Sequence, residues 1–275
     1  MKKSKTKAAA SAGRKSSKAA SAKTALPKLN LAEGGDGLRQ ALEILRDSSQ
    51  TVDKRLEALR VLQSASFGDE QFDAVRGDFV AALREVTEDK EVKLRQRALG
   101  LLARSQDSHA EKVLMAGLKQ PEKAVVPAAD ALHYLSYNLH SGVQSLARSI
   151  FESSKDQGVR QQALRLMSND PQALKTIQKT LADKKETVEI RQTSAEALHA
   201  LDPTAFQKWA SKAVLDKSEH ADVVATSLTA LQHFGDAKAI AGNSALRERL
   251  GEITAGKSAP KLKRMAKMIS SKYGL

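Results

Sequence analysis

The chain has 275 residues, of which 41% are hydrophobic and 4% aromatic, and none is cysteine. The lack of cysteine excludes disulfides and thiolate metal sites, and no window approaches the roughly 18 apolar residues that a membrane span needs. The formal net charge of +13 is concentrated at the ends: residues 1–32 and 257–275 hold fifteen Lys and Arg and no acid, whereas the middle carries 30 basic and 32 acidic side chains. Any polyanion-binding hypothesis therefore concerns the two ends.

The N-terminal segment has the composition of a disordered tail. Residues 1–25 are almost only Lys, Ala, Ser, Thr, Gly and Arg, which cannot bury enough apolar area to offset the loss of chain entropy. We therefore predict a disordered Lys/Ala/Ser-rich tail over residues 1–30. Because this segment has no apolar stretch, a secretory signal is not expected. We predict a cytoplasmic protein, with nucleoid or nuclear association as the alternative.

Residues 36–256 alternate helical patterns with short polar breaks, and one pattern recurs. An apolar residue is followed by Arg, and a small residue stands three positions after the Arg. Three positions after the small residue comes an apolar residue, followed by Leu or Met. This pattern is centred on Arg55, Arg95, Arg160 and Arg191, and weaker copies without the arginine start near residues 125 and 224. The copies are 30–40 residues apart, enough for two helices and two turns.

The segments before these copies also have helical periodicity. We predict first helices at residues 37–47, 70–86, 108–118, 142–153, 171–182 and 203–215. Pro121, Pro171 and Pro203 stand at or just before helix starts, where a missing N–H is tolerated, and Asp156 and Asp170 are predicted N-caps. Residues 257–275 predict a basic amphipathic helix that begins near Ser258 and caps the row.

The recurrent pattern resembles the HEAT-repeat family over about residues 38–235. The resemblance implies an all-α, right-handed solenoid of about six antiparallel helix pairs, whose second helices line a concave surface. In that family such surfaces bind proteins and sometimes nucleic acid. The resemblance also implies that Arg55, Arg95, Arg160 and Arg191 form an inter-repeat ladder, with direct ligand contact as the alternative.

A search for catalytic chemistry finds no known constellation. None of the six histidines is followed by Glu, and there is no Gly-x-Ser-x-Gly or Gly-rich phosphate loop. His133, Tyr137 and His140 are spaced i, i+4, i+7 and could share a helical face, but they are a thin metal-ligand set, and a polar helix end is the alternative. We therefore predict that the chain is not an enzyme and has no catalytic residue, cofactor or metal.

The function predicted from these features is a non-enzymatic scaffold that binds a protein partner on its concave face. The expected contacts are Arg60, Gln96, Arg97, Gln161, Gln162, Arg165, Gln192 and Glu196. The alternative is a nucleic-acid-associated protein whose lysines neutralise phosphates without reading sequence. Its expected polyanion contacts are Lys2, Lys3, Lys5, Lys7, Arg14, Lys15, Lys18, Lys23, Lys261, Lys263, Arg264 and Lys267. A solubilising tail and a capping helix are the structural interpretations of the same segments.

Overall fold

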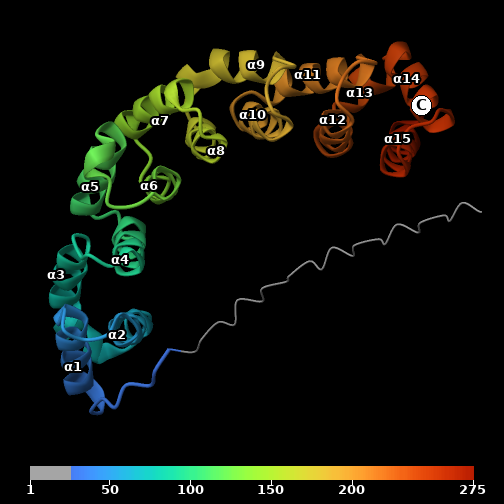
Figure 1. The fold of residues 1–275 in the computed structure, drawn as a ribbon. Coiled ribbons are helices and arrows are strands. Elements are labelled where there is room, and N and C mark those ends of the chain that lie inside the picture. The colour runs from blue at the N-terminus through green and yellow to red at the C-terminus, as the bar shows by residue number, and fades with distance from the viewer. Residues whose placement is uncertain (1–25) are drawn as a thin grey trace, which may run out of the picture. The chain divides into compact units, whose positions relative to one another are not determined.

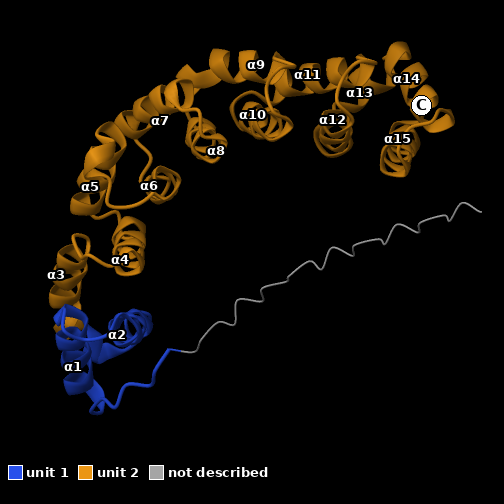
Figure 2. Ribbon diagram, in the orientation of Figure 1, with its two compact units in different colours: residues 1–72 blue, residues 73–275 orange. Residues whose placement is uncertain are grey.

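A computed structural model describes residues 26–275, and all regular secondary structure within that range is helical (Figure 1). The all-α class and the row of paired helices predicted from the sequence are confirmed. The predicted disorder of the tail falls almost entirely on residues 1–25, which lie outside the described residues. The chain divides into two compact units, unit 1 ending at Phe72 and unit 2 comprising Asp73–Leu275 (Figure 2).

Unit 1 contains one antiparallel pair, α1 (Gly34–Arg46) and α2 (Val52–Ala65), which pack against each other. The apolar stripe of each helix supplies its core: Leu45, Leu59 and Leu62 are at most 1% exposed. The Thr51 hydroxyl accepts a hydrogen bond from the Lys54 amide and caps the start of α2.

Unit 2 contains six further pairs among the described residues. The first helices of these pairs are α3 (Arg76–Val86), α5 (Ser108–Lys119), α7 (Ser141–Ser153), α9 (Leu174–Ala182), α11 (Pro203–Leu215) and α14 (Ser244–Ala255). The second helices are α4 (Val92–Arg104), α6 (Ala128–Leu135), α8 (Gln157–Met167), α10 (Val188–Leu201), α12 (Ala221–Phe234) and α15 (Pro260–Tyr273). Each second helix packs on its own first helix and on the second helices next to it, so that within unit 2 the second helices lie along the inner side of a curve (Figure 2).

Short helical segments complete the chain between these elements. They are η1 (Glu70–Val75), η2 (Pro121–Lys123), η3 (Pro171–Ala173) and α13 (Ala237–Ala241). The predicted N-caps are confirmed, because the Asp156 carboxylate accepts from the Val159 amide and the Asp170 carboxylate accepts from the Gln172 amide.

The small residue of the recurrent pattern has a packing role. Ala98, Ala163 and Ser194, three positions after their arginines, are completely buried at 0% exposure. A larger side chain there would hold neighbouring helices apart, since interaxial distance depends on the side chains at the contact. The Ser194 hydroxyl donates to the Ile190 carbonyl, so this buried polar group is satisfied.

Two differences from the sequence-based prediction concern the helices α6 and α14. The third copy of the pattern begins outside a helix, because Val126 precedes Pro127 and a residue before proline is disfavoured in the α conformation; α6 begins only at Ala128. The second difference is α14, which the sequence analysis did not predict. Because α15 packs against both α12 and α14, it is the second helix of an additional pair, and the described residues contain seven pairs in all.

Candidate functional site

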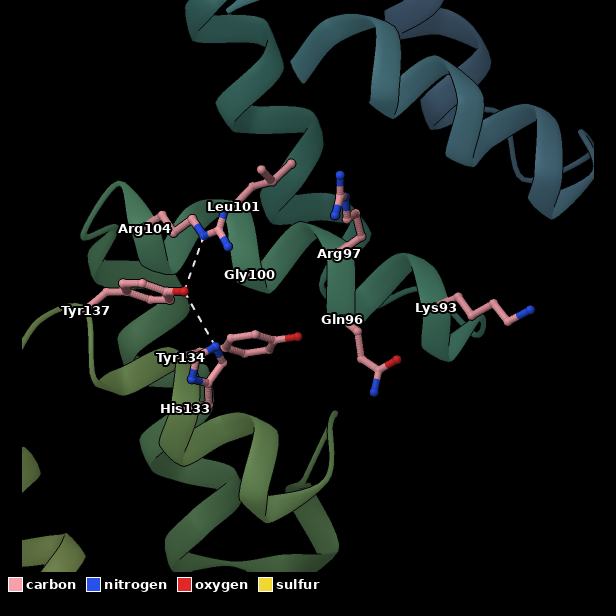
Figure 3. Close-up of a pocket in the computed structure, with 9 residues that line it drawn as sticks. All are labelled: Lys93, Gln96, Arg97, Gly100, Leu101, Arg104, His133, Tyr134 and Tyr137. Atoms are coloured by element: carbon pink, nitrogen blue, oxygen red, sulfur yellow. Dashed lines mark hydrogen bonds between the residues drawn. The ribbon is translucent and has the colours of Figure 1, made fainter. Parts of the chain in front are cut away.

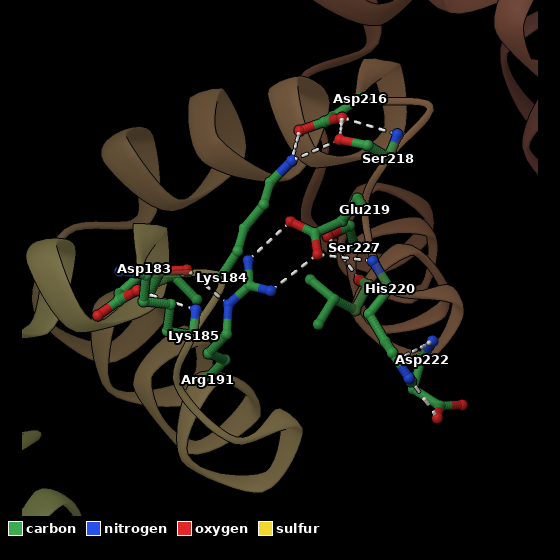
Figure 4. Close-up of polar contacts among 12 residues, drawn as sticks. Asp183, Lys184, Lys185, Arg191, Asp216, Ser218, Glu219, His220, Asp222 and Ser227 are labelled. Carbon is green, nitrogen blue, oxygen red and sulfur yellow. Dashed lines mark hydrogen bonds and ion pairs between the residues drawn. The ribbon is translucent and has the colours of Figure 1, made fainter.

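Arg191 links three elements of unit 2 (Figure 4). Its Nε donates to the Leu181 carbonyl at the end of α9 over 3.0 Å, and its two terminal nitrogens each donate to one oxygen of Glu219 over 2.7 Å. The two side chains are 4% and 5% exposed. The hydrogen bond from Arg191 lowers the pKa of the Glu219 carboxyl against the opposing effect of burial. The pair therefore ties α10 to the segment that begins α12.

Arg160 repeats this arrangement one pair earlier. Its Nε lies 3.4 Å from the Phe151 carbonyl in α7, and its guanidinium forms a bidentate pair with Glu186, which precedes α10. The hydrogen bond from Arg160 lowers the pKa of Glu186. Two successive junctions of unit 2 thus have the same ion pair.

The other two recurrent arginines bond to backbone carbonyls. Arg95 donates from Nε to the Val125 carbonyl of the next pair over 2.7 Å, and from a terminal nitrogen to the Asp89 carbonyl over 2.6 Å. Arg55, in unit 1, donates to the Leu45 carbonyl over 2.9 Å. Arg55, Arg160 and Arg191 therefore share a contact between Nε and a carbonyl near the end of the preceding helix, whereas Arg95 directs its Nε to the next pair.

Three residues predicted as ligand contacts bond to the next second helix instead. The side-chain amides donate from Gln96 to Asp130 (2.8 Å), from Gln161 to Thr193 (3.0 Å) and from Gln192 to Thr226 (3.0 Å). These bonds form a row across the inner helices. They leave the amide nitrogens engaged within the fold, so these side chains contribute to helix alignment.

The remaining predicted contacts are more accessible. Arg165 on α8 and Glu196 on α10 are exposed, and Gln162 is half-buried. Arg60, in unit 1, is paired with Glu57 through two hydrogen bonds of 2.5 and 2.7 Å. Arg97 on α4 lines a pocket.

This pocket lies between α4 and α6 and has a volume of about 330 Å³ (Figure 3). Three cationic side chains, Lys93, Arg97 and Arg104, come from one side of α4. The facing rings of His133, Tyr134 and Tyr137 come from α6 and the turn that follows it, and the lining is completed by Gln96, Gly100 and Leu101. No carboxylate is among the lining residues.

The polar groups of the pocket are held in place by one another. The Arg104 Nε lies 3.4 Å from the Tyr137 hydroxyl, and its guanidinium carbon lies 5.5 Å from the centre of the same ring, within the range of a cation–π interaction. The Tyr137 hydroxyl also lies 3.5 Å from the His133 Nε2. Gly100 matters because a Cβ there would lie 3.3 Å from Cε1 of Tyr134, so glycine allows this ring to approach the α4 backbone.

The Tyr134 phenol remains protonated at neutral pH. Burial raises its pKa above the ordinary value of 10.0, and the Asp130 carboxylate raises it further, while the Arg97 and Arg104 guanidiniums oppose this shift. Tyr134 can therefore donate a hydrogen bond to a ligand that enters between the two helices.

The histidine–tyrosine set considered for metal binding is divided by the fold. α6 ends at Leu135 and His140 caps the next helix, α7, where its Nε2 lies 3.0 Å from Glu111. Only His133 and Tyr137 share the pocket. Across residues 26–275 there is no group of three or more His, Asp or Glu side chains arranged to hold a metal ion.

The predicted polyanion contacts are divided between two regions. The eight in the tail lie outside the described residues. Those near the C-terminus lie on α15, where Lys261, Arg264 and Lys267 are exposed and Lys263 is half-buried. Within the described range, no helix is both long and apolar enough to cross a bilayer.

Comparison with known proteins yields distant likenesses of fold. No protein-family model and no curated protein matches the chain. It is similar to the structure of the complex of CpcE and CpcF of phycocyanin lyase from Nostoc sp. PCC7120, at 16% identity and a TM-score of 0.44, over 89% of this chain and 95% of the other. It is also similar to human deoxyhypusine hydroxylase in complex with glycerol, at 13% identity and a TM-score of 0.38, over 87% and 96%. These likenesses concern the helical repeat fold, and the relation to the HEAT-repeat family remains a resemblance.

The prediction that the chain is not an enzyme was drawn from missing motifs, and it is wrong. Both similar structures bear the names of enzymes, a lyase and a hydroxylase. The physical reason is that a helical repeat can assemble a site from side chains on separate helices. A search for contiguous motifs does not detect such a site.

Proposed function

We propose that unit 2 is a scaffold that binds a protein partner along its second helices. The observation that supports this proposal is the chemistry of their exposed side chains, which changes from basic at Arg97 and Arg165 to acidic at Glu196 and uncharged at Thr229. A nucleic-acid groove is more uniformly basic. A protein interface combines polar and charged groups with aromatic anchors, which Tyr134 and Tyr137 supply.

Site-specific photo-cross-linking in cells tests the proposal. A photoreactive amino acid is placed at exposed positions of the second helices, Arg165 and Glu196, and at exposed positions of first helices, Lys112 and Lys208. We expect discrete protein adducts from the first two positions and none of the same mass from the other two. Identical adducts from all four positions, or adducts that a nuclease removes, would contradict a protein interface on the second helices.

A second candidate function, nucleic-acid association, is favoured by one feature. α15 presents Lys261, Arg264 and Lys267 to solvent, and residues 257–275 contain no acid. Such a cationic surface attracts phosphates with an affinity that falls steeply with salt. A binding assay across a salt series tests this candidate. The probes are a labelled duplex and an RNA, and the proteins are the full chain, residues 26–275 and a Lys261→Gln/Arg264→Gln/Lys267→Gln variant. If neither the truncation nor the substitutions weaken binding, both basic ends are excluded as the nucleic-acid-binding surface.

A further inference from the structure

We propose that the pocket between α4 and α6 binds a phosphate monoester group. This inference rests on the proposed function and deepens it, because it names the group that a partner presents to the second helices. The same chemistry could come from a free phosphorylated small molecule. The pocket can be tested with small probes, before any partner is known.

The charge of the pocket fits a compact dianion. Lys93, Arg97 and Arg104 line it, and Asp130, the carboxylate that influences Tyr134, lies outside the lining and accepts a hydrogen bond from Gln96. Arginine is well suited to phosphate because its planar fork can form two parallel hydrogen bonds to one oxyanion. The lining therefore combines three cationic side chains with the Tyr134 hydroxyl, which can donate a hydrogen bond.

The cationic side chains form a local site and not a continuous basic groove. Lys93, Arg97 and Arg104 recur at i, i+4 and i+11 on α4, which places them on one side of the helix. The Tyr134 and Tyr137 rings line the pocket from α6 and the turn after it; Arg104 reaches toward the Tyr137 ring, while Lys93 and Arg97 extend away from the rings (Figure 3). The volume of about 330 Å³ is larger than a carboxylate requires and accommodates a phosphate with part of the group that carries it. Farther along unit 2, the exposed Glu196 of α10 reverses the charge, which disfavours a long polyanion across these helices.

Gly100 is a second, independent observation in favour of a pocket at this position. Glycine in a helix interior is unfavourable relative to alanine, and Gly100 lies in the middle of α4. A Cβ added at this position would lie 3.3 Å from the Tyr134 ring, closer than an ordinary van der Waals contact. Its small size keeps the two helices and the ring in the arrangement that forms the pocket.

The test measures binding of O-phosphoserine, inorganic phosphate and glycerol phosphate to the full chain by calorimetry, with the Gly100 amide followed by NMR. A peptide with one phosphoserine and its unphosphorylated counterpart form a second arm. Arg97→Gln and Arg104→Gln remove cations of the pocket, and Lys112→Gln removes an exposed cation on α5 as the matched control. Circular dichroism checks that each variant is folded.

We expect the phosphorylated probes to bind and to shift the Gly100 amide. Each pocket variant should lose about tenfold in affinity or more, the order expected for one charge-assisted hydrogen bond to phosphate, while Lys112→Gln binds as the wild type does. A phosphopeptide that binds more tightly than glycerol phosphate identifies a partner side chain as the source; the reverse order identifies a small molecule.

Three results would overturn the inference. They are no binding of any phosphorylated probe to the wild type, an equal loss in Lys112→Gln, and tighter binding of an oligonucleotide without a terminal phosphate at the same residues. None of these depends on a partner. The pocket can therefore fail while cross-linking still identifies a protein on the second helices, and cross-linking can fail while the pocket still binds phosphate.

Discussion

Arg191 and Glu219 share two hydrogen bonds of equal length, 2.7 Å, in a position where neither side chain is more than 5% exposed. Desolvating two charges is costly, and their attraction offsets that cost only while both partners are present. This relationship makes the junction between α10 and α12 sensitive to the loss of either residue.

Glu219→Ala should therefore destabilise unit 2 by about 3 kcal/mol, because it leaves the Arg191 guanidinium buried without its carboxylate. Urea unfolding, monitored by circular dichroism, gives the change in the free energy of unfolding. The control is Lys217→Ala, which removes a cation paired with Glu252 where the side chains are 69% and 37% exposed; we expect a change of no more than about 1 kcal/mol. Equal losses of stability in the two variants would show that burial does not determine how much an ion pair contributes to stability.

The stability of unit 2 should fall as the solution is acidified below about pH 4.5. Hydrogen bonds from Arg191 and Arg160 lower the pKa of Glu219 and Glu186 below the ordinary value of 4.5. The unfolded chain therefore takes up protons first, and the stabilisation present above pH 4.5 is lost as pH falls through the lowered values. Urea midpoints measured between pH 7 and pH 3 test this.

In Glu219→Gln the dependence on pH should be shallower but not flat. The pKa of Asp216 is lowered to about 2, mainly by a hydrogen bond from Lys184, and this carboxylate continues to titrate. A slope identical to that of the wild type would mean that Glu219 contributes nothing to acid sensitivity.

Gly100→Ala and Gly251→Ala should have different effects, although both glycines lie within helices of unit 2. A Cβ at Gly251 meets nothing within 4 Å, so alanine there should stabilise by about 0.5–1 kcal/mol through helix propensity. A Cβ at Gly100 would press on the Tyr134 ring at 3.3 Å, so the gain should be smaller or absent. Thermal unfolding of the two variants gives the comparison, and an equal gain would show that Tyr134 moves without cost.

The amide row should contribute to stability, whereas exposed neighbours should not. Gln192→Ala removes the bond to Thr226 and should cost about 1 kcal/mol. Glu196→Ala, one helical turn away and exposed, should stay within about 0.5 kcal/mol of the wild type. Denaturant midpoints of both variants decide the matter; a larger loss in Glu196→Ala would contradict the assignment of Gln192 to helix alignment.

The sequence was sufficient to predict most helices because the fold is local. Each pair needs only an apolar stripe and a break, and the arginine pattern located the second helices near Arg95, Arg160 and Arg191. The missed helix α14 has Leu246, Leu250 and Ile253 at i, i+4, i+7, all buried, but it is the first helix of its pair, and the recurrent arginine pattern marks only second helices. Periodicity alone was the available signal.

The candidate pocket could be predicted only in part. Arg97 was predicted as an inner-face contact, but Tyr134 was not singled out, because the register between α4 and α6 is set by packing that the sequence pattern does not specify. The bonds of Gln96, Gln161 and Gln192 to the next helix have the same origin. A glycine inside a predicted amphipathic helix, at Gly100, was the one sequence signal for a close approach.

The equivalence of the Arg160–Glu186 and Arg191–Glu219 junctions bears on how such a chain can change length. Each ion pair joins one helix pair to the next and reaches no farther. A duplication or loss of one whole period at these junctions would bring together ends that already fit, so the gene can lengthen or shorten the row in whole steps without redesigning an interface. In this part of the protein, the size of the proposed binding surface is therefore open to evolution separately from its stability.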